Sequence, residues 1–335
     1  MLRHSSDSEP GYTRQPKGRY WTYYDGDKRV TDRDTIERLN SIALPPAYKD
    51  AWFCKDPNGH LQATGIDDRG RKQYRYHPDF RAQAEASKFA GLAEFGKTLP
   101  KIRRKVDRDL KKRELSRDKV VAAVVRLLDE DYLRVGNREY AKENKSFGAT
   151  TLLSRQVKDD GRNVRMQFKG KSGIEHEVTI TDRTLRRIVR QLQELPGQAL
   201  FQYVNGDGKP HPISSTEVND YIREASGGDF TAKHFRTWSA SVIAFEQMLK
   251  KAEDARITVK TVIEPVAEAL GNTPAISRKS YVHPGLLDAV KTNPRDPLGD
   301  IQRPARRKRL SSAEVGLLEF LSRGKRGKKR KTATA

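Results

Sequence analysis

The sequence has a single cysteine, Cys54, and no long apolar run. One cysteine cannot form a disulfide within the chain, which agrees with a reducing compartment. No stretch approaches the ~18 to 20 apolar residues that cross a bilayer, and residues 1–19 lack the apolar core of a secretory signal. These absences predict a cytoplasmic protein that does not span a membrane. The hydrophobic content of 35% over 335 residues is sufficient for packed cores.

Signatures of several enzyme classes are also missing. None of the seven histidines stands in a His-x-x-x-His or cysteine-paired spacing, so we expect no metal site. The letters GKS at residues 170–172 suggest a phosphate-binding loop, but Arg165 stands where that motif requires its first glycine. No Gly-x-Ser-x-Gly or Cys-His nucleophile motif occurs. We therefore expect no cofactor and no bound nucleotide.

Positive charge is the strongest global feature. The chain has 66 lysines and arginines against 44 aspartates and glutamates, a formal net charge of +22. Residues 303–335 hold 12 cations and 2 acids and account for +10, so the remaining chain carries +12. The whole chain is therefore basic, which indicates a polyanionic partner, with nucleic acid the first candidate. On charge alone an acidic membrane surface is also compatible.

Local patterns divide the chain into four segments. We expect residues 1–18 to be a flexible amino terminus, 19–80 a small β-rich domain, 81–300 a mostly helical domain, and 301–335 a disordered basic tail. Short β-like runs separated by Asp-Gly and Pro-Asn-Gly turns indicate the β-rich domain. Ser116 is a candidate cap for the helix that follows it, and further helices are expected near residues 184–195, 216–225, 232–251 and 258–270. A hairpin is expected in NVRMQF-KGKSG-IEHEVTI, whose arms alternate apolar and polar residues. The fold class is therefore α+β.

Five polar residues stand in conspicuous contexts. They are Arg134 in LRVGN, Lys171 in FKGKSG, Arg236 in KHFRTW, and Asn272 and Tyr281 in GNTPAISRKSY. Each has an ordinary explanation by itself: a surface or phosphate-steering charge, a solvated turn residue, a helix cap, or an amphipathic anchor. In this order, however, the motifs resemble those of the small type IB DNA topoisomerases of bacteria and poxviruses, from about residue 20 to residue 283.

The resemblance implies a role for each residue. The type IB topoisomerases share their fold with the tyrosine recombinases, and they act on duplex DNA as monomers, without ATP, metal or cofactor. Tyr281 would attack a phosphodiester and become joined to the 3′ phosphate, and Arg134 and Arg236 would neutralise the charge that develops on the phosphate. Lys171 would protonate the departing 5′ oxygen, and Lys233 matches a family lysine that can share this task. Asn272 stands where poxvirus members carry histidine, and its amide could donate one neutral hydrogen bond.

The amino-terminal domain resembles the family's DNA-facing module. The residues that match its major-groove contacts are Gln73, Tyr74 and Tyr76, and their neighbours Arg71, Lys72 and Arg75 can contact phosphates or sugars. An exposed edge strand with solubilising charges is a serious alternative explanation for each of these residues taken individually. The predicted location is the cytoplasm, in association with the nucleoid.

Two other functions remain open at this point. A tyrosine recombinase shares the catalytic set, but that class usually shows His-x-x-Arg at the second arginine, where this chain has Lys233 before Arg236, and its amino-terminal domain is helical. A non-enzymatic DNA-binding protein explains the charge but not the ordered motifs. The sequence does not reveal the preferred cleavage site, any general base, or the role of the basic tail.

Overall fold

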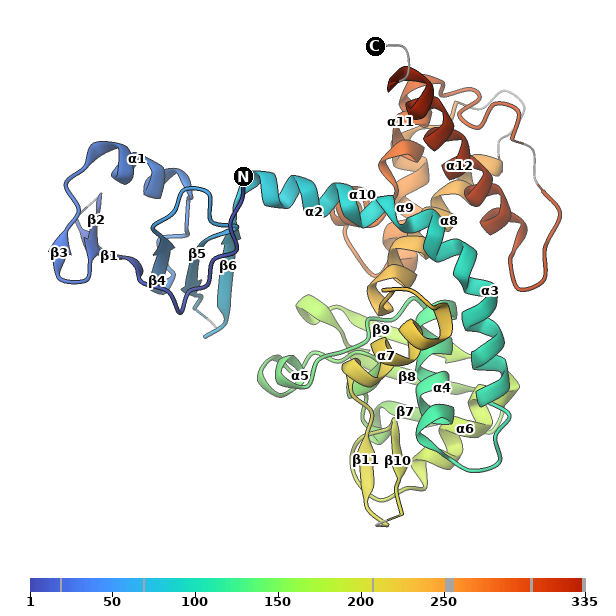
Figure 1. Cartoon of the computed structure of the whole chain (residues 1–335). Coiled ribbons are helices and arrows are strands. Elements are labelled where there is room, and N and C mark those ends of the chain that lie inside the picture. Colours follow the sequence, from blue (N-terminus) through green and yellow to red (C-terminus); the bar gives the residue numbers. More distant parts are fainter. Residues whose placement is uncertain (19, 69, 207, 251–255, 302–303, 333–335) are drawn as a thin grey trace. The chain divides into compact units, whose positions relative to one another are not determined.

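A computed structural model describes residues 1–18, 20–68, 70–206, 208–250, 256–301 and 304–332, with backbone alone for residues 85–86, 140, 172 and 324–332. Its contacts divide the chain into two compact units, Met1–Ala90 and Gly91–Ala335. The division falls after Ala90, whereas the sequence suggested a boundary after residue 80. Figure 1 shows the elements of each unit.

The first unit is built on one antiparallel sheet of six strands in the order β3-β2-β1-β4-β5-β6. The strands are β1 (Gly11–Lys17), β2 (Tyr20–Asp25), β3 (Lys28–Arg29), β4 (Lys49–Cys54), β5 (Leu61–Ile66) and β6 (Lys72–Tyr76). Gly26 supplies the positive φ of 56° that the tight turn between β2 and β3 requires. A small core of Tyr23, Leu39, Phe53 and Ala63 joins the sheet to helix α1 (Arg33–Ser41). Helix α2 (Pro78–Ala90) ends the unit.

The amino terminus is not a flexible segment, so that prediction is wrong. Arg3 forms a bridge with Gly59, and the Ser5 hydroxyl donates to the Leu61 carbonyl at 3.0 Å. Strand β1 lies inside the sheet, between β2 and β4. The polar and charged residues and Pro16 of β1 give no strand pattern in the sequence, because the stability of this strand comes from pairing with distant residues.

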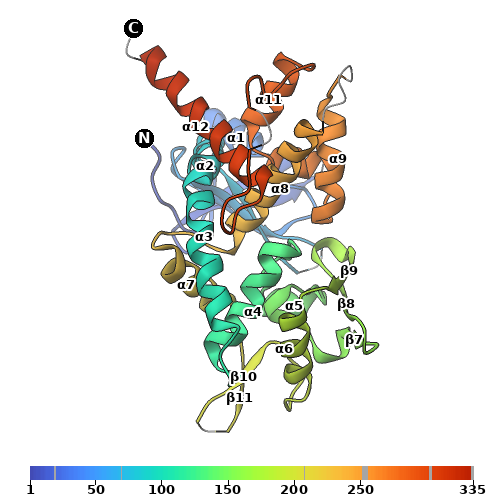
Figure 2. The ribbon, with the colours of Figure 1, turned by 90° about the vertical axis from the view of Figure 1, so that its right-hand side faces the viewer.

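The second unit is mostly helical. Its helices are α3 (Leu92–Asp109), α4 (Arg117–Glu130), α5 (Arg138–Asn144), α6 (Arg183–Gln193), α7 (Ser215–Ser226), α8 (Ala232–Leu249), α9 (Val259–Leu270), α10 (Pro274–Ser280), α11 (Pro284–Thr292) and α12 (Ser312–Thr332). Helix α4 is buried on nearly every side and packs against α3, α7 and α8, and Figure 2 shows α3 and α4 side by side. Ser116 is its N-cap residue, as predicted, although its hydroxyl makes no capping hydrogen bond.

Two small sheets complete this unit. Strands β7 (Val157–Asp159), β8 (Val164–Lys169) and β9 (Glu175–Ile180) form a three-stranded sheet, and β10 (Gln202–Val204) pairs with β11 (Pro210–Pro212). Strands β8 and β9 form the predicted hairpin, with a single 3₁₀ turn at Lys171–Gly173. In β8 the pattern of buried and exposed residues alternates, which is why the period-two sequence pattern identified it.

The prediction of a disordered tail from residue 301 is wrong for residues 304–323, while residues 302–303 and 333–335 of that tail lie outside the described residues. Leu310, Leu317 and Leu321 are buried, and Glu314 accepts hydrogen bonds from Arg103 Nη2 at 2.8 Å and from Trp238 Nε1 at 3.0 Å. The start of α12 is therefore part of the core of the second unit. The dense basic residues that follow hid this apolar stretch.

Candidate active site

Arg236 lies near the start of α8 and is only 5% exposed. Its Nη1 donates to the Tyr132 carbonyl, and its Nη2 donates to the Leu270 carbonyl at 2.9 Å. The second acceptor belongs to the last turn of α9, where the helix dipole favours a cation. Arg236 Nε is buried and has no hydrogen-bond partner among the described residues. The guanidinium is therefore fixed on two sides, while its Nε–H stays unpaired among the described residues.

Arg134 lies in the irregular segment between α4 and α5. Its carbonyl accepts the Ala149 N–H at 2.8 Å. Gly148 is required beside it, because a Cβ at that position would lie 2.6 Å from the Arg134 carbonyl oxygen. The Arg134 side chain reaches across the fold and donates from Nη2 to Asn272 Oδ1 at 2.7 Å.

Asn272 does not cap a helix with its side chain. Gly271, with a φ of 60°, ends α9, and the Thr273 side chain caps the start of α10 by accepting the Ile276 N–H. The Asn272 amide instead presents its oxygen to Arg134, while its Nδ2 is buried without a partner among the described residues. A second N–H donor is thus left unpaired near the two arginines.

Tyr281 follows the last residue of α10. Its N–H donates to the Ser277 carbonyl at 3.1 Å, and the next residues are tied to α8 because the His283 N–H donates to Ser241 Oγ at 3.0 Å. The Tyr281 ring lies under Arg236, with the guanidinium carbon 5.1 Å from the ring centre. A cation at this distance is attracted to the face of the ring.

The two arginines change the acidity of this tyrosine. Burial acts to raise the pKa of Tyr281, but the charges of Arg236 and Arg134 and their hydrogen bonds to it lower the pKa below its usual value. Burial, followed by the Arg134 charge, lowers the pKa of Arg236 to about 10, against the opposing effect of Tyr281. Arg236 is therefore still charged at neutral pH, and the phenol is easier to deprotonate than a free tyrosine.

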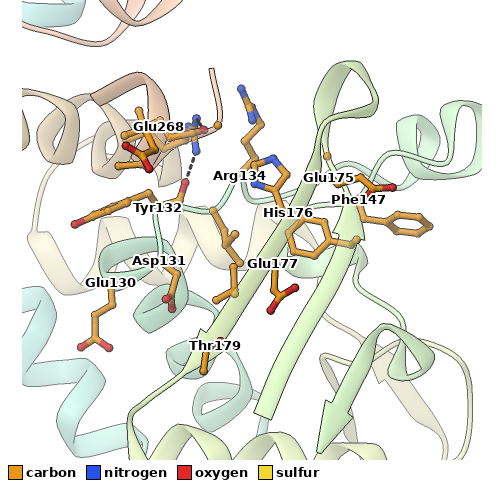
Figure 3. A pocket seen from close by; sticks show the side chains of 18 residues that line it. Glu130, Asp131, Tyr132, Arg134, Phe147, Glu175, His176, Glu177, Thr179 and Glu268 are labelled. Carbon is orange, nitrogen blue, oxygen red and sulfur yellow. Dashed lines mark hydrogen bonds between the residues drawn. The ribbon is translucent and has the colours of Figure 1, made fainter. Parts of the chain in front are cut away.

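A cavity of about 390 Å³ opens beside these residues, lined by Arg134, Arg236, His176 and Gly271 among others. Figure 3 shows Arg134 and His176 close together and marks the hydrogen bond accepted by the Tyr132 carbonyl. The sequence analysis did not single out His176. The alternating pattern of the hairpin was enough to predict that His176 lies opposite Phe168. It could not predict that His176 lies beside the two arginines.

The two lysines are arranged differently from the arginines. Lys171 is exposed at the tip of the β8–β9 hairpin, and Lys233 is exposed in the first turn of α8. Neither makes an ion pair or hydrogen bond through its ammonium group within the described part of the chain. The structure thus brings Arg134, Arg236, Asn272 and Tyr281 together, while both lysines remain on the surface.

The predicted DNA contacts lie on β6, an edge strand of the first unit. Tyr74 and Tyr76 are exposed on one face, with their rings stacked at 6.2 Å and an interplanar angle of 12°. Gln73 is on the opposite face and donates to Asp67 Oδ2 at 3.0 Å.

The cations beside these tyrosines are partly neutralised. Arg71 pairs with Asp67 at 2.7 Å and Lys72 pairs with Asp7, whereas Arg75 is in no ion pair within the described residues. The exposed aromatic pair is therefore the clearest feature of this surface.

The described residues contain no group of three or more His, Cys, Asp or Glu side chains that could hold a metal ion. None of the helices in the same part of the chain has the length and apolar character of a membrane span. A partly buried phenol below two guanidinium groups, with the Arg236 Nε–H and the Asn272 Nδ2–H unpaired among the described residues, is suited to a substrate that carries anionic oxygens.

Comparisons with known proteins agree with this chemistry. Residues 77–294 match the family model described as "Eukaryotic DNA topoisomerase I, catalytic core", and residues 20–67 match "Bacterial DNA topoisomerase IB, N-terminal domain". The chain is 34% identical over 298 residues to "DNA topoisomerase 1B" of Acanthamoeba polyphaga mimivirus, covering 85% of this chain and 88% of the relative.

More distant relatives come from poxviruses. The chain is 23% identical over 294 residues to "DNA topoisomerase 1" of rabbit fibroma virus (strain Kasza), covering 81% and 89% of the two chains. It is 20% identical over 275 residues to "DNA topoisomerase 1B" of vaccinia virus (strain Western Reserve), covering 78% and 83%. The similarity to these relatives therefore extends over most of both chains.

Proposed function

The chain belongs to the type IB DNA topoisomerase family, and we propose that Tyr281 is its nucleophile, assisted by Arg134, Arg236 and Asn272. Members of this family relax supercoiled DNA without ATP or a metal ion. They cut one strand through a 3′-phosphotyrosyl intermediate, let the duplex rotate about the intact strand, and reseal the break. The family match over both units does not support the alternatives, a tyrosine recombinase or a non-enzymatic DNA-binding protein.

In the proposed cleavage step, the Tyr281 phenol releases its proton to water and its oxygen forms a bond to phosphorus, while the bond from phosphorus to the 5′ oxygen breaks. Negative charge then increases on the non-bridging phosphate oxygens, and a metal-free site must neutralise it with fixed donors. The unpaired Nε–H of Arg236 and the unpaired Nδ2–H of Asn272 are the observation that carries this proposal. Buried N–H groups without partners are costly, so their presence favours an anionic ligand at this place.

The leaving 5′ oxygen needs a proton, and we assign this task to Lys171, with Lys233 as its helper. Both ammonium groups are exposed and unpaired within the described residues, so bound DNA can draw them toward the phosphate without breaking an existing ion pair. The proton returns to the lysine when the 5′ hydroxyl attacks the phosphotyrosine and reseals the strand. Because the ester keeps the energy of the broken bond, no nucleotide is consumed.

Duplex DNA is the substrate, and we propose that β6 supplies contacts to it. Tyr74 and Tyr76 present a stacked aromatic surface on one face of the strand. On the other face Arg75 is available to phosphates, and Gln73 can read base edges once its amide leaves Asp67. Arg71 and Lys72 can also contact phosphates, but each must first exchange its carboxylate partner. A monomeric enzyme in the cytoplasm, associated with the nucleoid, is part of the same proposal.

The test of the nucleophile is Tyr281→Phe, which removes only the phenolic oxygen. We expect this variant to bind duplex DNA as the wild type does but to lose both plasmid relaxation and the covalent adduct, measured with EDTA and without ATP. Tyr203→Phe is the matched control, because Tyr203 is a partly exposed tyrosine on β10 that stacks on His211. An adduct on the 3′ end in denaturing gels of Tyr281→Phe would show that another residue is the nucleophile.

A further inference from the structure

The imidazole of His176 occupies a defined place on the β8–β9 hairpin. His176 pairs with Phe168 across the two strands, and their rings are stacked with centroids 5.4 Å apart and an interplanar angle of 14°. The ring is partly buried and lines the cavity beside Arg134 and Arg236 (Figure 3). The stacking fixes the plane of the imidazole, so that its edges point away from Phe168.

Those edges meet two glycines. A Cβ added to Gly170 would lie 2.5 Å from His176 Cδ2, and a Cβ added to Gly271 would lie 2.5 Å from His176 Cε1. Both distances are shorter than real Cβ contacts, so each glycine allows its backbone to touch the ring. The imidazole therefore fills the space between the hairpin tip and the turn that joins α9 to α10.

Each glycine directly precedes a residue of the proposed chemistry: Gly170 precedes Lys171, and Gly271 precedes Asn272. The backbone at Gly170 is well fixed, because its N–H donates to the Ile174 carbonyl at 2.7 Å. Beyond this point the Lys171 side chain is exposed and unpaired within the described residues. The distance between the hairpin and the Asn272 turn thus depends on what occupies the slot between the two glycines.

We propose that His176 is a positioning residue, which fills this slot and so aligns Lys171 and Asn272 on the same phosphate. The inference rests on the proposed function. A misplacement of about 1 Å at a reacting group can cost ~10²-fold in rate, so the spacing across the slot matters for the chemistry. Burial and the charges of Arg134 and Arg236 keep the pKa of His176 below its ordinary value, which agrees with a neutral ring that acts by packing.

The experiment compares single-turnover cleavage of two DNA duplexes, one with the natural 5′ oxygen and one with a 5′ sulfur at the scissile bond. Sulfur leaves without protonation, so a defect that acts through Lys171 should shrink on the sulfur substrate. We expect His176→Ala to slow cleavage ~10- to 100-fold on the oxygen substrate and at least about fivefold less on the sulfur substrate. DNA affinity should not change.

Two further variants separate packing from other roles. His176→Phe fills the slot without ring nitrogens and should recover most of the rate. Gly170→Ala keeps the imidazole but inserts a methyl group at its edge, so it should show the same dependence on the leaving group even if His176→Ala does not fold. His211→Ala is the matched control, because this histidine also stacks on an aromatic neighbour across a strand pair, on β11.

The outcomes distinguish this inference from the proposed function. A wild type that forms no covalent adduct on either substrate would overturn both. If the wild type forms the adduct but His176→Ala and Gly170→Ala are slowed equally on the oxygen and sulfur substrates, the positioning role alone would be overturned. A His176→Phe variant as slow as His176→Ala would also overturn it, because the ring nitrogens would then be required.

Discussion

Replacing Asn272 by alanine removes an amide that has two separate tasks in this structure. Its oxygen accepts the hydrogen bond from Arg134 Nη2 at 2.7 Å, and its buried Nδ2 has no partner among the described residues. Loss of one N–H donor to a developing oxyanion typically costs ~10²- to 10³-fold in rate, or about 2.7 to 4 kcal/mol. We expect a decrease of this size in the cleavage rate of Asn272→Ala.

Two other substitutions at this position separate its tasks. Asn272→Asp keeps the acceptor for Arg134 but replaces the donor by a negative oxygen. Two unit charges about 4 Å apart repel by ~4 kcal/mol at an effective dielectric constant of 20, so this variant should be slower than Asn272→Ala. Asn272→His restores a donor and should remain active, while adding a titration at or below the imidazole reference pKa of ~6.5.

Single-turnover cleavage of a duplex oligonucleotide measures these rates between mildly acidic and mildly alkaline pH. At pH 7 the expected cleavage rates, from fastest to slowest, are those of the wild type, Asn272→His, Asn272→Ala and Asn272→Asp. The wild type should show no pH dependence from position 272, because an amide does not titrate. Equal rates for wild type and Asn272→Ala, or an aspartate variant faster than the alanine variant, would refute the assignment of Asn272 as a donor to the phosphate.

Three further predictions concern the proposed acid, the basic carboxyl-terminal segment and a partly buried carboxyl group. Lys171→Ala should slow cleavage strongly with a 5′ oxygen and much less with a 5′ sulfur, and equal defects would remove Lys171 from the role of acid. Deletion of residues 324–335, which hold six cations and no acids, should reduce the slope of log DNA affinity against log salt concentration by at most about five. An unchanged slope would mean that this segment does not contact DNA. Burial, and to a lesser extent Glu130, raises the pKa of Asp131 to about 7, above its unfolded value, so the folded state loses stability as the pH rises from about 4 to 7. Asp131→Asn should remove this loss and be about 1 to 2 kcal/mol more stable than the wild type at pH 8, a value reduced from the full pKa shift to allow for solvent screening. Urea unfolding of both proteins at pH 5 and pH 8 measures this difference in stability. A difference that is no larger at pH 8 than at pH 5 would contradict the prediction.

The tail prediction depends on where α12 packs. Cutting the chain at residue 303 would also remove Glu314 and Leu317, which are buried in the second unit. Glu314 is the partner of Arg103 and Trp238, so its loss would leave a partly buried guanidinium without one of its carboxylates. A cut after residue 323 removes the basic end and keeps these contacts.

Local sequence patterns predicted much of the fold. The alternation in NVRMQF and IEHEVTI identified the β8–β9 hairpin, and helical periodicity with capping residues placed α6, α7, α8 and α9 within a few residues of their observed ends. These predictions succeeded because strand and helix periods are set by the backbone geometry of neighbouring residues. They failed for β1 and for the start of α12, because both are stabilised by contacts with residues far away in the chain.

The sequence by itself determined which residue types are available for the chemistry and in which order: two arginines, two lysines, an amide and a tyrosine in motifs that resemble one family. The tertiary structure alone decided that Arg134 pairs with Asn272 across 138 residues of chain and that Arg236 is buried over the Tyr281 ring. It also decided that the Arg236 Nε–H and the Asn272 Nδ2–H find no partner among the described residues. It also placed His176 between Gly170 and Gly271. Burial and hydrogen-bond partners depend on how distant segments pack, and local periodicity carries no information about that packing.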